Sequence, residues 1–169
     1  MAYDPAAARA GDVVLVCGGS ATLPGRLLDA AIRCSEGSPF THAAQVVDTG
    51  GGALGLIQGV ATVQRAPVDQ YAVPGYLYRV RGATDAQIAA VTAWLTARIG
   101  QRYGYRELIA LGLQLDVHLQ TRRHFHHWVC STLVNRAWAM AGHPLTLAPM
   151  PTPANLADSV RLLGPRPVA

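Results

Sequence analysis

The hydrophobic pattern of the chain changes its period near residue 83, and this change most restricts the possible fold. Before it, short apolar runs and alternating segments predict strands at 13–17, 41–48, 53–59 and 76–81, and 60–68 continues the sheet. After it, apolar residues recur at helical spacing in 88–100, 105–115 and 129–142. A chain in which strands precede helices is expected to form an α+β domain.

Local signals mark where several of these elements begin and end. The glycine-rich turn 49–52 joins two of the predicted strands into a hairpin. Thr84 and Gln87 have the spacing of a capping box at a helix start. Gly142 is a natural helix stop, and Thr152 is expected to cap a short helix near the C-terminus. A further short helix is predicted within 23–37.

The composition fits one domain over 1–169. Half of the residues are hydrophobic and 14% are charged, which supplies a sizeable core and argues against disorder. The formal charge of +4 comes from arginines, because the chain has no lysine. Only Arg122 and Arg123 form a tight pair, and we therefore expect no nucleic-acid partner.

Nothing in the sequence predicts membrane insertion or secretion. The first twelve residues lack the basic start and apolar run of a signal peptide, and no apolar run reaches the length of a transmembrane segment. We therefore expect synthesis in the cytoplasm, with delivery by another route if the protein acts outside the cell. Three irregularly spaced cysteines do not indicate a disulfide framework.

Cys130 is the candidate nucleophile because it lies where a polar loop changes into an amphipathic helix. The backbone N–H groups and the dipole of a helix N-terminus favour a thiolate and can hold an oxyanion on a substrate. The alternative is that Cys130 only packs, as free cysteines usually do. Packing is the expectation for Cys17, inside an apolar strand, and Cys34 has no supporting context.

Metal binding is a rival interpretation of the same region. Zinc binds histidine and cysteine, and several such residues lie close together: His118, His124, His126, His127 and Cys130. Structural zinc sites normally combine two short ligand spacings, whereas all these candidates fall in one run. We therefore expect no functional metal and no cofactor, and a solvated histidine-rich loop.

A nucleophilic cysteine requires an imidazole, and the imidazole requires an acceptor that orients it. His42 begins a predicted strand, and Gln58 ends the next strand of the same hairpin. Adjacent strands could place the two side by side, so that the Gln58 amide oxygen accepts from the imidazole and fixes its tautomer. A lone strand histidine is, however, more often structural.

The ordered set of motifs resembles a known family. "IGQRYGY" and "CSTLVNRAWAMAG" resemble blocks of NlpC-like cysteine peptidases, which have a papain-like fold. The histidine strand precedes the cysteine, which resembles the circularly permuted YiiX/YebB-like branch. Its hallmarks appear in order over about 11–159: Gly11-Asp12, "SPFTH" ending at His42, "YLYRV", and Cys130-Ser131. The resemblance implies a papain-like antiparallel sheet or small barrel packed against helices.

By this resemblance Cys130 is the nucleophile, His42 is the base, and the hydroxyl of Tyr103 polarises the substrate carbonyl. Gln58 stands where the family usually has Glu or His, and Val129 replaces an aspartate frequent before the cysteine. The implied activity is cleavage of an amide bond, foremost in peptidoglycan peptides, as in a phage or cell-wall lysin. A lipid or acyl-ester hydrolase, an acyltransferase, or a non-catalytic module on the same fold remain alternatives.

Overall fold

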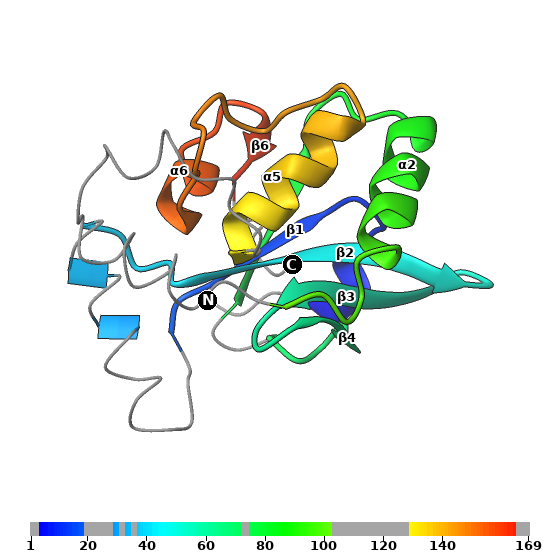
Figure 1. Ribbon diagram of the computed structural model, residues 1–169, viewed down its shortest axis with the longest axis horizontal. Coiled ribbons are helices and arrows are strands. Elements are labelled where there is room, and N and C mark those ends of the chain that lie inside the picture. The colour runs from blue at the N-terminus through cyan, green and yellow to red at the C-terminus, as the bar shows by residue number, and fades with distance from the viewer. Residues whose placement is uncertain are drawn as a thin grey trace.

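The computed structural model of the chain describes residues 4–18, 29–30, 33–34, 37–71, 75–102 and 129–164. Within these ranges the fold is α+β, as the sequence predicts, with one antiparallel sheet and three helices (Figure 1). Tyr103, the helix predicted at 105–115 and the histidine-rich loop lie outside the described residues. In the segment 23–37 only residues 29–30 and 33–34 are described as helical.

The sheet has six strands in the order β4-β3-β2-β1-β5-β6, and every pair of neighbours is antiparallel. The sheet is open, with β4 and β6 at its two edges, and is not a closed barrel. The strands are β1 (Val13–Val16), β2 (His42–Gly50), β3 (Ala53–Gly59), β4 (Val63–Pro67), β5 (Gly75–Val80) and β6 (Leu162–Leu163). Every predicted strand is present. The sequence does not predict β6, because two apolar residues are too few to show the pattern of a strand.

The helices are α2 (Asp85–Thr96), α5 (Cys130–Met140) and α6 (Pro153–Ala157), and a 3-10 turn, η1, covers Pro5–Ala7. Their ends follow the local signals. Thr84 and Gln87 form the predicted capping box. Thr152 accepts a hydrogen bond at the start of α6, and Gly142 follows α5 with a φ of 76°, which favours glycine.

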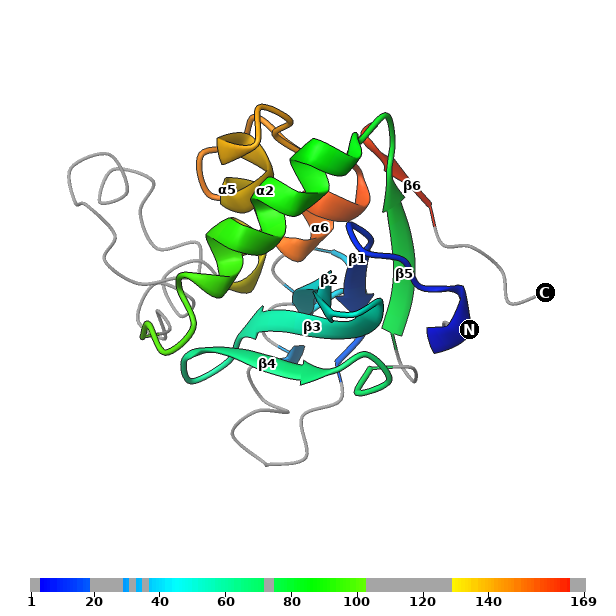
Figure 2. The same cartoon turned by 90° about the vertical axis from the view of Figure 1, so that its right-hand side faces the viewer.

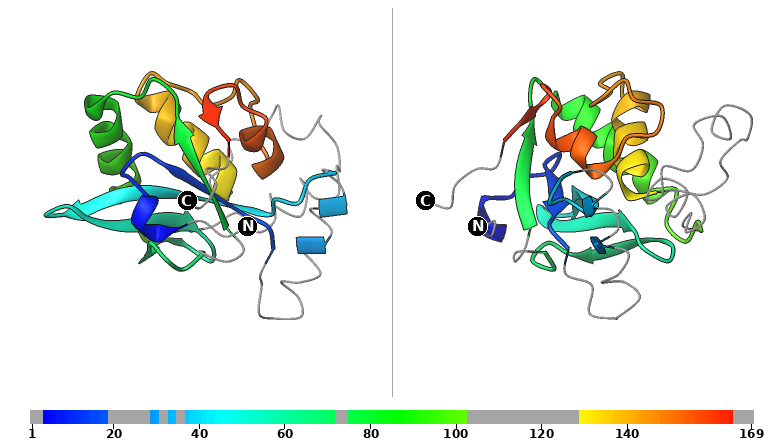
Figure 3. Two further views of the ribbon diagram at one scale, coloured as in Figure 1. Left: turned by 180° about the vertical axis from the view of Figure 1, so that it is seen from behind. Right: turned by 90° about the vertical axis from the view of Figure 1, so that its left-hand side faces the viewer.

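All three helices lie against one face of the sheet (Figures 1 and 2). This face carries the main core, in which Leu15, Ile57, Leu95, Leu133 and Trp138 are fully buried. The opposite face buries a second, smaller cluster that includes Val14, Leu56 and Leu77, and Ala8 beside η1 joins it. Figure 3 shows η1 on this second side. Both faces are thus covered, which explains the continuous apolar run of β1.

A buried polar contact fixes α5 on the sheet. The Trp138 indole Nε1–H donates to Gln45 Oε1 on β2 at 2.8 Å, and neither side chain is exposed. The Gln45 amide in turn donates to the backbone oxygen of Asp12 at 2.9 Å. Burying the indole N–H or the amide without a hydrogen-bond partner would cost stability. The contact therefore specifies where α5 lies along β2.

The Gly11-Asp12 motif and the arginine of the strand "YLYRV" are far apart in the sequence but meet where β1 pairs with β5. The buried carboxylate of Asp12 accepts from Arg79 Nε at 2.9 Å and from Arg79 Nη2 at 3.0 Å. Asp12 Oδ2 also accepts from the backbone N–H of Arg9 at 3.0 Å. The preceding residue, Gly11, has a φ of 93°, and a Cβ there would lie 2.8 Å from the Ile88 side chain of α2. The Gly-Asp pair and the arginine strand therefore have a structural role.

Replacing Gln45 by Met tests the contact between β2 and α5. Gln45→Met keeps the length of the side chain but leaves the Trp138 N–H buried without its acceptor, and we expect a loss of about 1–3 kcal/mol in the free energy of unfolding. Urea denaturation measures this loss. Gln64→Met, at an exposed position of β4, is the matched control and should change stability by less than about 0.5 kcal/mol. Equal effects of the two substitutions would contradict the assigned contact.

Candidate active site

Cys130 is the first residue of α5 and is buried, with 1% of its surface exposed. Val129 is the N-cap of this helix, and the Thr132 hydroxyl in the first turn accepts from the Val129 N–H at 3.1 Å. The first intrahelical bond of α5 runs from the Leu133 N–H to the Val129 oxygen. The N–H groups of the first turn are therefore not used within the helix, which is the arrangement that can stabilise an anion.

Side chains after the cysteine hold this end of α5 in place. The Ser131 hydroxyl is fully buried and donates to the Pro151 oxygen at 2.6 Å. One turn later, Asn135 Oδ1 accepts from the backbone N–H groups of Leu145 and Thr146 at 2.9 and 3.0 Å. The segment between α5 and α6 is thus attached along one side of α5, and the position of Cys130 is defined by packing and by polar contacts.

His42 and Gln58 lie together because of the register between β2 and β3. Ala44 pairs with Gln58, and His42 precedes Ala44 by two residues, so that all three side chains point to the same face. Diagonal neighbours on an antiparallel pair are within reach of long side chains. The His42 Nε2 atom lies 2.9 Å from Gln58 Oε1, with His42 partly buried and Gln58 fully buried.

Cys130 completes this group, since its side chain is near enough to the imidazole for its charge and contact to raise the pKa of His42. An imidazole has two ring nitrogens. Because Nε2 faces an amide oxygen, Nε2 carries a proton, and Nδ1 is left for the thiol. The structure therefore brings together three residues singled out in the sequence, Cys130, His42 and Gln58, in the order thiol, imidazole, amide. Tyr103 lies outside the described residues.

The pKa of His42 results from opposing influences. Burial is the largest single influence and lowers the pKa, because it disfavours the imidazolium. The charge of Cys130, its hydrogen bond, the hydrogen bond to Gln58 and the charge of Asp29 all raise the pKa. The net result is a pKa above the ordinary value for histidine. The charged imidazole is thus stabilised chiefly by the cysteine beside it.

Two residues of this site were not singled out in the sequence. The Tyr71 hydroxyl donates to Gln58 Oε1 at 2.7 Å, and its ring lies 5.5 Å from the His42 ring. Gln58 Nε2 donates to Gln70 Oε1 at 3.5 Å. Both residues belong to the polar turn after β4, whose composition predicts a turn and does not indicate which side chains face the sheet.

The other described cysteines differ from Cys130. Cys17, next to the end of β1, is partly buried, and its pKa is raised, mainly by burial, which the positive charges of the N-terminus and Arg33 partly offset. Cys34 is exposed. The expectation that Cys17 packs without a chemical role agrees with its environment, since a raised pKa disfavours the reactive thiolate.

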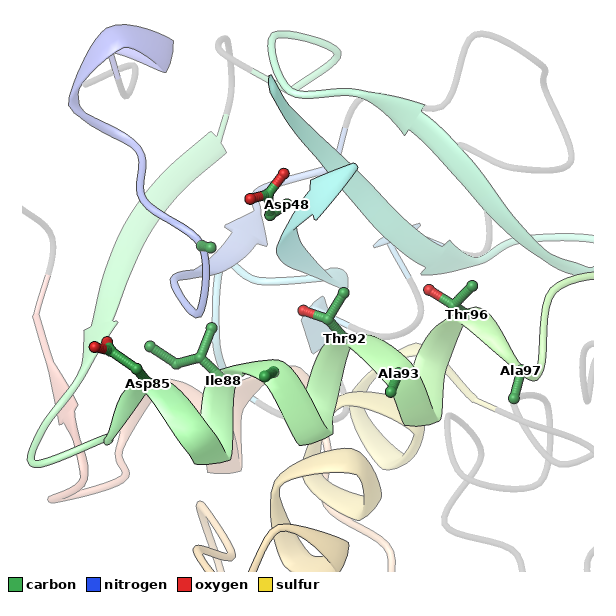
Figure 4. A pocket seen from close by; sticks show the side chains of 9 residues that line it. Asp48, Asp85, Ile88, Thr92, Ala93, Thr96 and Ala97 are labelled. Atoms are coloured by element: carbon green, nitrogen blue, oxygen red, sulfur yellow. The ribbon is translucent and has the colours of Figure 1, made fainter. Parts of the chain in front are cut away.

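A cavity of about 750 Å³ lies elsewhere, along α2 and the far end of β2. Figure 4 shows Asp85, Ile88, Thr92 and Thr96 of α2 on one side of it and Asp48 across from them. Its lining includes neither Cys130 nor His42, and it offers no nucleophile paired with a base. The cavity is therefore not assigned to the site.

No family model and no curated protein matches the chain. Among solved structures, the fold is similar to that of the metalloprotein YiiX from Escherichia coli O157:H7, at 14% sequence identity and a TM-score of 0.69. The match covers 92% of this chain and 94% of that chain. It supports the YiiX-like fold expected from the motifs. At this identity the likeness concerns the fold alone.

That neighbour is described as a metalloprotein. Over the described ranges, no group of three or more His, Cys, Asp or Glu side chains could hold a metal ion. Nε2 of His42 already contacts Gln58, so that His42 has only Nδ1 left as a metal ligand. The described residues thus offer no set of ligands for a resident metal, and the histidines at 118–127 lie outside the described residues.

In the part of the chain that the structure describes, no helix combines the length and the apolar character needed to cross a lipid bilayer.

The contact between Cys130 and His42 is tested by titrating His42. Cys130→Ala removes two of the influences that raise the pKa and leaves burial, which lowers it. We expect the pKa of His42 to lie above the ordinary value of about 6.5 in the unmodified protein and to fall below its own wild-type value in Cys130→Ala. The Cε1–H resonance followed by NMR against pH measures both, and Cys34→Ala is the control. An unchanged midpoint in Cys130→Ala would contradict the contact.

Proposed function

We propose that the chain is a cysteine hydrolase that cleaves an amide bond, with Cys130 as nucleophile, His42 as general base and acid, and Gln58 as the residue that orients His42. The observations that support this proposal are the position of Cys130 beside His42, where it raises the pKa of the imidazole, and the 2.9 Å separation between His42 Nε2 and Gln58 Oε1. A buried cysteine at a helix start, beside an oriented imidazole, is the arrangement that nucleophilic catalysis requires.

The first half of the reaction forms an acyl-enzyme. The Cys130 thiol proton passes to Nδ1 of His42, and the thiolate sulfur attacks the substrate carbonyl carbon. The carbonyl electron pair moves onto oxygen, and N–H groups of the first turn of α5 stabilise the resulting oxyanion. When the oxyanion collapses, the C–N bond breaks, and His42 gives its proton to the departing amine. A thioester between the substrate acyl group and Cys130 remains.

The second half hydrolyses the thioester. His42, now neutral, accepts a proton from a water molecule while the water oxygen attacks the thioester carbonyl. The tetrahedral intermediate expels the thiolate, which is paired again with the imidazolium. Gln58 stays bonded to Nε2 throughout, so that the same ring nitrogen, Nδ1, exchanges the proton in every step.

For the substrate we propose peptidoglycan peptides. The support is the motif resemblance to NlpC-like peptidases together with the formal charge of +4, which favours association with an anionic polymer such as cell wall. The role of Tyr103 in polarising the carbonyl remains part of the same proposal, as does action in a phage or cell-wall lysin. An acyl-ester hydrolase or acyltransferase would use the same thioester chemistry.

The proposed activity is tested by comparing the wild type with Cys130→Ala on peptidoglycan fragments, ordinary peptides and acyl esters. We expect turnover of cell-wall peptides by the wild type and a loss of about 10⁴-fold or more in kcat for Cys130→Ala. Cys17→Ala, which removes a partly buried thiol outside the site, is the matched control and should retain activity.

The pattern over the panel separates the alternatives. If the wild type cleaves only acyl esters, the same residues act on a lipid or acyl substrate and not on an amide. Equal turnover by the wild type and Cys130→Ala would overturn the assignment of the nucleophile. A wild-type protein inert on every substrate class would favour a non-catalytic binding module.

A further inference from the structure

Tyr71 contacts both His42 and Gln58 at once. Its hydroxyl donates to Gln58 Oε1 at 2.7 Å, and its ring lies 5.5 Å from the His42 ring at an interplanar angle of 57°. The ring also packs against the apolar cluster on the second face of the sheet, which includes Leu56 and Leu77. Tyr71 is therefore held in place by the core and reaches the site with a single polar atom.

The orientation of the Gln58 amide decides whether His42 can act as a base. An amide has an oxygen that accepts and an NH₂ group that donates, at opposite ends of a nearly symmetrical shape. With the oxygen toward His42, Nε2 carries the proton and Nδ1 can accept from the thiol. With the amide rotated by half a turn, Nε2 must accept, the proton moves to Nδ1, and Nδ1 can no longer take the proton of Cys130.

Tyr71 and Gln70 both favour the productive orientation. A phenol donates its proton to the oxygen end of the amide; facing the NH₂ end it could only accept, and its own proton would lose this acceptor. Burial raises the pKa of Tyr71 above its ordinary value, so that the phenol stays protonated. At the other end, Gln58 Nε2 donates to Gln70 Oε1 at 3.5 Å. The longer contact and the exposure of Gln70 make Tyr71 the stronger of the two constraints.

We propose that Tyr71 is a positioning residue that selects the reactive tautomer of His42 by fixing the Gln58 amide. Its hydroxyl donates to Gln58, and the hydroxyl therefore acts on His42 through the Gln58 amide. The consequence for catalysis rests on the proposed function, because the tautomer matters only if His42 accepts the Cys130 proton. The effect on the tautomer itself does not depend on catalysis.

The direct test measures the tautomer of neutral His42 by ¹⁵N NMR in a Cys130→Ser background at pH 9. We expect the form protonated at Nε2 to dominate. Adding Tyr71→Phe keeps the ring against His42 but removes the donor, and the ratio of the Nε2–H to the Nδ1–H form should fall about fivefold to tenfold, the worth of one hydrogen bond. His42→Ala identifies the resonance.

Two comparisons separate positioning from a general structural effect. Tyr76→Phe removes a hydroxyl from β5, where the ring packs against Phe40, and should leave the tautomer ratio unchanged. In a Gln58→Ala background, Tyr71→Phe should have no further effect, because the residue through which it acts is gone. An unchanged ratio in Tyr71→Phe, or the same fall with and without Gln58, overturns the proposal.

A second readout links the tautomer to the nucleophile. Alkylation of Cys130 by iodoacetamide at pH 6.5, followed by peptide mass spectrometry, should slow about fivefold to tenfold in Tyr71→Phe and remain at the wild-type rate in Tyr76→Phe. If the tautomer shifts but alkylation of wild-type Cys130 is as slow as that of Cys34, the positioning by Tyr71 stands and the proposed nucleophile fails. If wild-type Cys130 reacts fast and Tyr71→Phe changes neither readout, the positioning fails alone.

Discussion

The hydrogen bond between Trp138 and Gln45 is the contact on which the rest of the site depends. It fixes α5 against β2 at one point, with Cys130 eight residues earlier on the helix and His42 three residues earlier on the strand. These separations correspond to about 12 Å of helix and about 10 Å of strand. Because helix and strand run in the same direction over similar lengths (Figure 1), the core contact places the start of α5, with Cys130, near the start of β2, with His42.

The site itself depends on a balance of charge and burial at His42. Burial disfavours the imidazolium more than any other single influence, and yet the pKa of His42 is raised, first by the charge of Cys130. Gln58 and Tyr71 are neutral, so they orient the ring without adding a full charge to the buried site. The charge of Cys130 therefore favours the imidazolium most strongly among the influences that raise the pKa of His42, and Asp29 contributes through space.

The sequence predicts those parts of the fold and site that depend on local signals. The glycine-rich turn and the alternating strands indicate the hairpin, and its register places Gln58 beside His42. Contacts between distant segments leave no such signal: Gln45 and Trp138 are 93 residues apart. Tyr71 follows β4 in a turn, where no periodicity shows which way a side chain points. These residues become apparent only once the sheet and helices are packed.

The ionisation state of Cys130 tests the central claim most directly. Thiolates absorb near 240 nm, and the difference between wild type and Cys130→Ser isolates this one thiol even though it is buried. An ion pair with His42 predicts a difference of about one thiolate per molecule already near pH 6. A difference that appears only around pH 8.5 or above, as for an ordinary thiol, would contradict the account.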